Sequence, residues 1–318
     1  MPAITATAPG KIILFGEHAV VYGRPAIAAP VFQVEARAVV RADPRAAPGA
    51  VRLQAPGIGL EADLEALPEN HPLAAAVRGA LEALKITLPP ACTIRVTSTI
   101  PKAAGLGSGA AVTVAVLRAL SAFLGRPLPN ETVSSLAFEV EKLHHGTPSG
   151  IDNTVITYRK PVYFVRGQPV ETIQVRRPFT LVIADTGIQS PTAIAVGDLR
   201  RAWQEDPDRY ELLFDRAGEI AREARRAIEA GETDSLGPLM NDNHALLREM
   251  GVSSPELDSL VSAACQAGVQ GAKLSGGGRG GNMIALAPEG RATTIARALQ
   301  QAGAKSTILT ELKTYSST

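Results

Sequence analysis

The chain contains 318 residues, of which 45% are hydrophobic and 20% are charged, and its formal net charge is +1. This length and composition indicate a globular protein of roughly two domains. The balanced charge argues against a protein that binds nucleic acid or an anionic membrane. The two cysteines, Cys92 and Cys265, argue against a disulfide-rich scaffold and indicate a reducing compartment.

The start of the chain and its most apolar segment carry no targeting or membrane signal. The first ten residues lack the basic stretch and apolar run of a signal peptide. Residues 110–124 are apolar, but Arg118 interrupts them and they are too short to span a bilayer. We therefore expect a cytoplasmic protein that acts on a small molecule, with no nucleic-acid or membrane partner. Its oligomeric state stays open, with a homodimer as one option.

The first half of the chain is predicted to be rich in strands that alternate with a few helices. A turn is expected at Pro9 and Gly10, and Asn130 is expected to cap a helix. The predicted strands cover residues 3–8, 11–15, 26–40, 51–60 and 91–99. The predicted helices cover residues 70–84, 110–120 and 131–143.

After Pro191 the chain becomes charged and amphipathic, which indicates a second domain. We place the division between residues 1–185 and 186–318, although no linker marks it. The strands predicted after residue 160 cover residues 162–165, 180–184, 271–275, 282–287 and 306–313. The helices predicted after residue 190 cover residues 193–201, 209–230, 254–267 and 291–301.

A glycine-rich loop that runs directly into a predicted helix is the strongest functional signal. Its glycines leave backbone N–H groups available at the positive end of the helix dipole, an arrangement that binds phosphate. No Gly-Lys-Ser/Thr tripeptide occurs in the chain, so the loop is not the P-loop of an NTPase. A tight strand-to-helix turn without a ligand is the alternative. The loop residues concerned are Pro101, Gly105, Leu106, Gly107, Ser108, Gly109, Ala110 and Ala111.

Three charged residues, Lys11, Glu17 and His18, interrupt an otherwise apolar segment near the start of the chain. Polar groups within a segment expected to be buried must find partners or perform a function. A surface lysine and a core histidine with satisfied hydrogen bonds are the structural alternatives.

A second polar segment follows the predicted helix that carries Glu141, where a Pro-Ser-Gly turn places Asp152 at the start of the next element. A local role of Asp152 in that turn is the alternative to a catalytic one. His144 and His145 are adjacent, so their side chains point apart on a helix, and no third ligand is spaced for zinc.

The last glycine run, residues 276–281, contains Gly276, Gly277, Gly278 and Arg279. It matches the spacing of a dinucleotide-binding loop, but a predicted strand follows where that fold requires a helix. Arg279 could contact a phosphate or carboxylate, or be only a charge at the rim. A bare β-hairpin turn is the alternative for the whole run.

In chain order, these four segments resemble the GHMP kinases, and among them the mevalonate kinases. The resemblance extends from Ala8 to Leu286, and the segments 16–21 and 145–153 are its most specific parts. It implies an α+β protein of two domains, the first similar to domain 2 of ribosomal protein S5 and the second ferredoxin-like. It also implies ATP and Mg²⁺ as cofactors. The implied reaction is the ATP-dependent phosphorylation of the 5-hydroxyl of mevalonate to 5-phosphomevalonate, on the route to isopentenyl diphosphate.

The resemblance also implies roles for individual residues. Asp152 and Lys11 would pair and act on the substrate hydroxyl, and either proton removal by Asp152 or charge stabilisation by Lys11 would serve. The resemblance further implies that the substrate would contact Glu17, His18 and Thr192. It implies that Mg²⁺ would be bound by Ser108 and Glu141.

The chain departs from the family pattern at two positions. Gly109 stands where a second serine is common, so Ser108, a water molecule or Glu141 alone would have to complete the magnesium site. Arg279 interrupts the last glycine run. Another kinase of the family, such as a phosphomevalonate kinase, and a catalytically silent ligand sensor on the same fold are the alternative functions. A mevalonate diphosphate decarboxylase is disfavoured because it lacks the arrangement of Lys11, Glu17 and His18.

Overall fold

The computed structural model describes residues 3–101, 104–145, 148–189 and 192–314, with only the backbone of His144 and His145. The chain divides into two compact units whose segments alternate along the sequence. Unit 1 contains residues 1–10, 34–100 and 107–159, and unit 2 contains residues 11–33, 101–106 and 160–318. The units alternate because the long strands β1 (Ile4–Phe15) and β2 (Ala26–Ala42) each continue from one unit into the other. The single division expected after residue 185 stays a prediction.

Unit 1 is built on a sheet in the order β4-β3-β5-β2, with β1 also paired to β2. β3 and β5 run parallel, whereas the pairs β3–β4 and β2–β5 are antiparallel. Pro9 and Gly10 lie inside β1, so the expected turn at these residues is wrong. The further strands of this unit are β3 (Val51–Ala55), β4 (Leu60–Asp63) and β5 (Cys92–Ser98).

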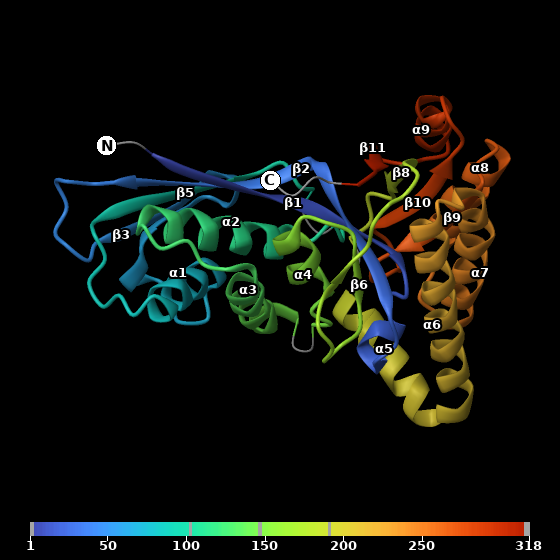
Figure 1. Cartoon of the computed structure of the whole chain (residues 1–318), viewed down its shortest axis with the longest axis horizontal. Coiled ribbons are helices and arrows are strands. Elements are labelled where there is room, and N and C mark those ends of the chain that lie inside the picture. Colours follow the sequence, from blue (N-terminus) through green and yellow to red (C-terminus); the bar gives the residue numbers. More distant parts are fainter. Residues whose placement is uncertain (1–2, 102–103, 146–147, 190–191, 315–318) are drawn as a thin grey trace. The chain divides into compact units, whose positions relative to one another are not determined.

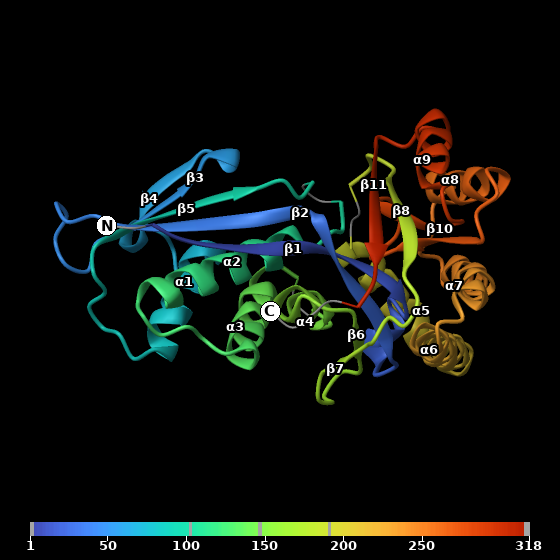
Figure 2. The same cartoon turned by 45° about the horizontal axis from the view of Figure 1, so that its top comes forward.

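Helices cover one face of the unit 1 sheet, as Figures 1 and 2 show. Small residues line their buried sides, so α2 packs closely against its neighbours. Arg118 of α2 joins three helices, because its guanidinium donates to Asn130 Oδ1 and, at 3.0 Å, to the Thr157 carbonyl. The helices are α1 (Pro72–Ala83), α2 (Ser108–Phe123), α3 (Asn130–His145) and α4 (Ile151–Tyr158).

Unit 2 contains an antiparallel sheet in the order β11-β8-β10-β9. Its strands are β8 (Phe179–Asp185), β9 (Gly271–Ser275), β10 (Asn282–Ala287) and β11 (Ser306–Leu312). Most residues of the inner strands β8 and β10 are apolar and buried, which is typical of strands covered on both faces. Two short strands, β6 (Val162–Phe164) and β7 (Glu171–Thr172), pair with each other, and β6 also pairs with residues 26–28 of β2.

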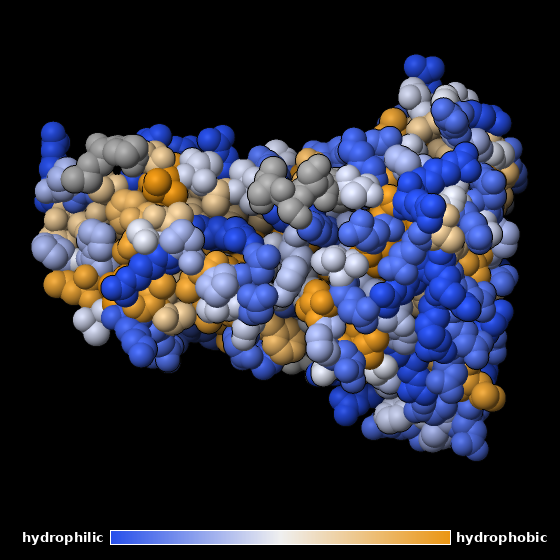
Figure 3. All heavy atoms as spheres, viewed as in Figure 1, coloured by the Kyte–Doolittle hydropathy of each residue, from blue (hydrophilic) through white to orange (hydrophobic). Residues whose placement is uncertain are grey.

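Helices α7, α8 and α9 pack against the unit 2 sheet, and α5 and α6 pack beside them (Figure 2). The bounds are α5 (Thr192–Glu205), α6 (Pro207–Ala230), α7 (Leu236–Glu249), α8 (Pro255–Gln266) and α9 (Ala292–Gln301). Over α6 and α7, the face shown in Figure 3 is mostly hydrophilic. This agrees with the amphipathic pattern predicted for the charged second half of the chain.

Two helices were not predicted as helices: α4, expected only as an element that begins near Asp152, and α7, for which no element was expected. The reason is clearest for α7. Its sequence contains glycine, proline and two asparagines, so intrinsic helix propensity is low. Tertiary packing stabilises it instead: Gly237 of α7 lies against the backbone of Gln270 and Gly271, where a Cβ atom on either glycine would clash. Asn241 Oδ1 also accepts the Ala272 N–H at 3.0 Å.

The remaining expected elements are found with shifts of a few residues at their ends, and the α+β class is confirmed. The strand expected over residues 51–60 is shorter, because β3 ends at Ala55 and a 3₁₀ turn follows. Asn130 is the first residue of α3. Among the described residues, no helix is long and apolar enough to cross a membrane.

Candidate active site

Within unit 2, three segments singled out in the sequence lie in contact. The Lys11 N–H donates to the Leu106 carbonyl of the central glycine loop at 3.0 Å. Asn282, directly after the last glycine run, donates through its side chain to the Ala104 carbonyl. The Ser275 hydroxyl, directly before that run, bonds both the N–H and the carbonyl of Ile13 at 3.1 and 2.7 Å. These contacts hold the three segments together within unit 2, so the segments are not separate surface turns.

Glu17 forms a fully buried ion pair with Lys273 of β9, with 1% and 0% of the two side chains exposed. Lys273 also donates to the Leu274 carbonyl at 2.5 Å. Burial lowers the pKa of Lys273, and the nearby carboxylate opposes that shift. The second carboxylate oxygen of Glu17, Oε2, is buried without a hydrogen-bond partner. An acceptor atom in this state is suited to a hydroxyl group of a bound substrate.

His18, the next residue, also has a buried side-chain atom without a hydrogen-bond partner, its Nε2. Its imidazole bonds the backbone of Gly277, and burial lowers its pKa to about 4, so the ring is neutral at pH 7. The backbone at His18 has a φ of 63° and a ψ of −54°, a conformation that L-residues seldom adopt. Strained backbone of this kind persists where the surroundings fix it, and it is frequent at functional sites.

The last glycine run forms the loop of the hairpin between β9 and β10, where Ser275 pairs with Asn282. Arg279 within it donates to Asp198 of α5 and to the Gly251 carbonyl, at 3.4 and 3.3 Å for the latter. All three nitrogen atoms of the guanidinium thus donate hydrogen bonds to residues of unit 2. These contacts favour a structural role for Arg279 over the phosphate contact that the sequence left open.

Thr192, the first residue of α5, lies against this hairpin loop. A Cβ atom at Gly277 would clash with the Thr192 side chain, so the absence of a side chain at position 277 is what allows the contact. Thr192 and the His18 partner Gly277 are therefore neighbours within unit 2.

The part of the central loop that belongs to unit 1 is the N-terminus of α2. Gly107 precedes it with a φ of 73°, and no side chain caps the first turn. Gly105, two residues earlier and in unit 2, has a φ of 76°, and nothing lies within 4 Å of a Cβ placed there. The first N–H groups of a helix without a side-chain cap have no partner within the helix, and such groups can bind phosphate. Ser108 begins the helix, and Gly109 has room for a side chain, because nothing lies within 4 Å of a Cβ placed there.

Asp152 also lies at a helix start in unit 1, as the second residue of α4 after Gly150 with a φ of 91°. Its neighbours fix this turn: the Asn153 side chain donates to Ser134 at 2.9 Å, and Thr154 Oγ1 donates to the Gly150 carbonyl at 2.7 Å. The pairing of Asp152 with Lys11 stays a prediction, because the two residues belong to different units.

The residues expected to bind magnesium have suitable chemistry. Glu141 is a buried carboxylate on α3, and Ser108 offers a hydroxyl at the start of α2. Mg²⁺ prefers oxygen ligands and is usually bound by one or two carboxylates together with phosphate groups of the substrate. Within the described ranges no group of three or more His, Cys, Asp or Glu residues could hold a metal. One carboxylate and one hydroxyl are oxygen ligands of the kind that fits a magnesium ion also bound by phosphate groups.

Sequence reasoning missed Lys273, Ser275 and Asn282. Each flanks the glycine run, but their partners are more than 170 positions away in the chain, so local spacing gave no signal. The sequence held one indication of them: all three are polar or charged residues in strands predicted to be buried. Such residues require hydrogen-bonding or charged partners.

Comparison with known proteins identifies the family. The model of the GHMP kinases N terminal domain matches residues 73–160, and that of the GHMP kinases C terminal region matches residues 224–305. A mevalonate kinase of Thermococcus sibiricus is 38% identical over 94% of this chain and 93% of its own length. The chain belongs to the mevalonate kinases of the GHMP kinase family. The expected two-domain fold of this kinase is thereby confirmed.

Two solved structures show what the fold alone can decide. The L. major mevalonate kinase in complex with R-mevalonate has a TM-score of 0.82 and 33% identity, covering 98% of this kinase and 97% of that chain. The Streptococcus pneumoniae phosphomevalonate kinase in complex with phosphomevalonate and AMPPNP has a TM-score of 0.83 at 17% identity, covering 98% and 100%. The fold is thus common to kinases of different substrates, and the choice of substrate rests on side chains.

Proposed function

We propose that this kinase transfers the γ-phosphoryl group of ATP to the primary 5-hydroxyl of mevalonate. The product would be 5-phosphomevalonate, on the route to isopentenyl diphosphate. The observation that carries the proposal is the pair of unsatisfied buried atoms, Glu17 Oε2 and His18 Nε2, on adjacent residues. They offer one hydrogen-bond acceptor and one further polar atom to a substrate with hydroxyl groups. A mevalonate kinase as relative at 38% identity supports the same substrate.

The described residues supply the parts that phosphoryl transfer requires, which are mainly positioning and charge neutralisation. The N–H groups at the start of α2 would bind the phosphates. Ser108 and Glu141 would hold Mg²⁺, which neutralises phosphate charge when bound. Asp152 would accept the proton of the attacking hydroxyl, and Lys11 would stabilise the developing negative charge.

The charges near the acceptor residues disfavour phosphomevalonate as the substrate. A second, already phosphorylated group would be expected to meet an additional arginine or lysine. Of the cations found beside Glu17 and His18, Lys273 is paired with Glu17 and Arg279 with Asp198. Lys11, Glu141 and Asp152 are all present, which disfavours a catalytically silent sensor.

The deciding experiment compares acceptors at saturating ATP and Mg²⁺. We expect ADP release with mevalonate, and much slower turnover of phosphomevalonate, galactose and homoserine. Phosphorus NMR of the product should show one phosphate ester on the primary oxygen. Phosphate on the tertiary oxygen, or faster turnover of phosphomevalonate, would contradict the proposal.

A further inference from the structure

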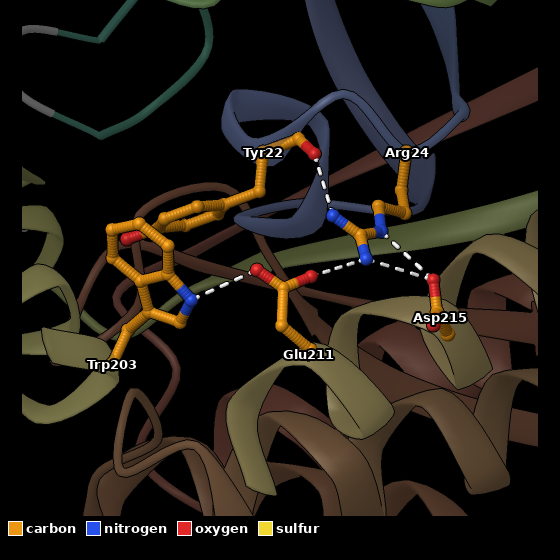
Figure 4. Close-up of polar contacts among 5 residues, drawn as sticks. All are labelled: Tyr22, Arg24, Trp203, Glu211 and Asp215. Atoms are coloured by element: carbon orange, nitrogen blue, oxygen red, sulfur yellow. Dashed lines mark hydrogen bonds and ion pairs between the residues drawn. The ribbon is translucent and has the colours of Figure 1, made fainter. Parts of the chain in front are cut away.

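A polar and aromatic cluster lies within unit 2, at the end of the segment that carries Glu17 and His18. We call it the Arg24 cluster; Figure 4 shows Tyr22, Arg24, Trp203, Glu211 and Asp215. It joins the segment after the 3₁₀ turn η1 (Ala19–Tyr22) to the end of α5 and the first half of α6. None of the predicted roles in phosphoryl transfer uses it.

Glu211 is the centre of the cluster because each of its carboxylate oxygens has a different partner. Oε1 accepts from the Trp203 indole N–H at 2.9 Å, and Oε2 accepts from Arg24. Arg24 also donates to Asp215 at 2.9 Å and to the Tyr22 carbonyl at 2.8 Å. One carboxylate thus connects α5, α6 and residues 16–26, which carry Glu17 and His18 and which we call the acceptor segment. Hydrogen bonds connected in this way stabilise one another.

Aromatic packing holds the same three elements together. The ring of Tyr22 stacks on Phe214 with a centroid distance of 4.1 Å and an interplanar angle of 13°, and Trp203 lies 5.3 Å from Tyr22. Gly218 of α6 lets Arg24 and Pro25 approach, since a Cβ there would lie 3.1 Å from Arg24 Cγ. The end of the acceptor segment therefore packs against α6 from Glu211 to Gly218, which is about two helical turns.

The contact with α6 can affect the position of His18, because the two ends of the acceptor segment lie against each other. A Cβ at Gly16, where φ is +83°, would clash with Pro25 and Ala26, so the two ends of the segment touch. His18 lies inside this closed loop in its unfavourable backbone conformation. Strain of this kind relaxes when the surrounding contacts loosen.

We propose that Glu211 is a positioning residue for the acceptor site: by binding Arg24 and Trp203 together, it fixes the segment that presents Glu17 and His18 to the phosphoryl acceptor. The proposal rests on mevalonate phosphorylation as the proposed function. The cluster is partly exposed, with 22% of Arg24 and 39% of Glu211 accessible, so its contribution to global stability is small. Its effect is therefore expected on acceptor binding rather than on folding.

The test measures KM for mevalonate, KM for ATP, kcat and Tm in Glu211→Gln, Arg24→Gln and the double variant. Each single variant should raise KM for mevalonate about fivefold and leave KM for ATP within about twofold. The double variant should resemble the single ones, because both substitutions break the same link. Trp203→Phe, which keeps the ring and removes only the donor, should show a smaller rise of the same kind.

Glu219→Gln is the matched control, since Glu219 on the same helix forms an exposed ion pair with Arg216 at 3.1 Å. It should leave all four quantities unchanged. Equal rises in both KM values, a lowered Tm with unchanged KM, or no effect of Glu211→Gln would each overturn the proposal. A wild-type enzyme that does not turn over mevalonate would instead overturn the proposed function, and this inference with it.

Discussion

The candidate functional residues of unit 1 and those of unit 2 are held in opposite ways. In unit 1, Ser108 and Asp152 lie at helix starts, with glycines before them and open space at Gly109. In unit 2, Glu17 is buried in an ion pair with Lys273, and His18 is buried with its backbone in a strained conformation. The first arrangement uses backbone N–H groups and has room for a side chain at Gly109, whereas the second depends on specific buried partners. Function and stability should therefore separate at Asp152 in unit 1 and be coupled at the buried Glu17 in unit 2.

The largest effect is expected from Asp152→Asn in unit 1. Loss of a general base should lower kcat by at least about 10²-fold. The neighbouring anchors Asn153 and Thr154 remain, so Tm and ATP affinity should change little. Steady-state kinetics together with thermal unfolding would check this, and near-normal turnover would contradict the catalytic role of Asp152.

A buried partner in unit 2 should behave differently. Glu17→Gln leaves the Lys273 cation buried without its counter-charge, so the free energy of unfolding should fall by about 3–5 kcal/mol. The double variant Glu17→Gln/Lys273→Met removes both charges and should regain most of that loss. Urea unfolding measures both, and Glu139→Gln, which breaks an exposed pair with Lys142 on α3, is the control. A loss below about 1 kcal/mol in Glu17→Gln would refute the coupling of stability to this site.

Acidification should sharpen the same contrast. Burial lowers the pKa of His18 and of His244 to about 4, so the unfolded chain binds more protons between the ordinary value of 6.5 and about 4. Stability should therefore fall as the pH decreases from 7 to 5, by about 1–2 kcal/mol for each histidine. His18→Asn, which removes the titrating ring and keeps a polar side chain, should flatten the dependence of unfolding free energy on pH. An unchanged slope in this variant would contradict the buried neutral state of His18.

The smallest effect concerns the magnesium site in unit 1. If Glu141 carries more of the coordination because position 109 lacks a hydroxyl, Glu141→Gln should raise the Mg²⁺ concentration for half-maximal rate by about tenfold, in the range for changes around a bound metal. Gly109→Ser should be tolerated, since a Cβ there meets nothing within 4 Å, and should leave that concentration unchanged or lower it. Equal Mg²⁺ titrations of the wild type and Glu141→Gln would remove Glu141 from the site.

Local and tertiary determinants also explain which of the elements predicted from the sequence were found. Helix α2 and its glycine loop were found where expected, because Gly105 and Gly107 indeed have positive φ and helix formers follow at once. α7 was missed, since its stability comes from the close approach of Gly237 to β9 rather than from local propensity. The turn expected at Pro9 and Gly10 was wrong, because pairing with β2 keeps β1 continuous through both residues.

The sequence by itself determined the α+β class, the order of most elements, the family and the segments that carry the candidate site residues. These properties follow from periodicity, glycine positions and short motifs, which are local. Only the tertiary structure decided that Glu17 pairs with Lys273, that Arg279 binds Asp198, and that Glu211 joins Arg24 to Trp203. These partners are separated by up to 256 positions in the chain. The physical reason is that a buried charge requires some partner, whereas packing alone selects which one.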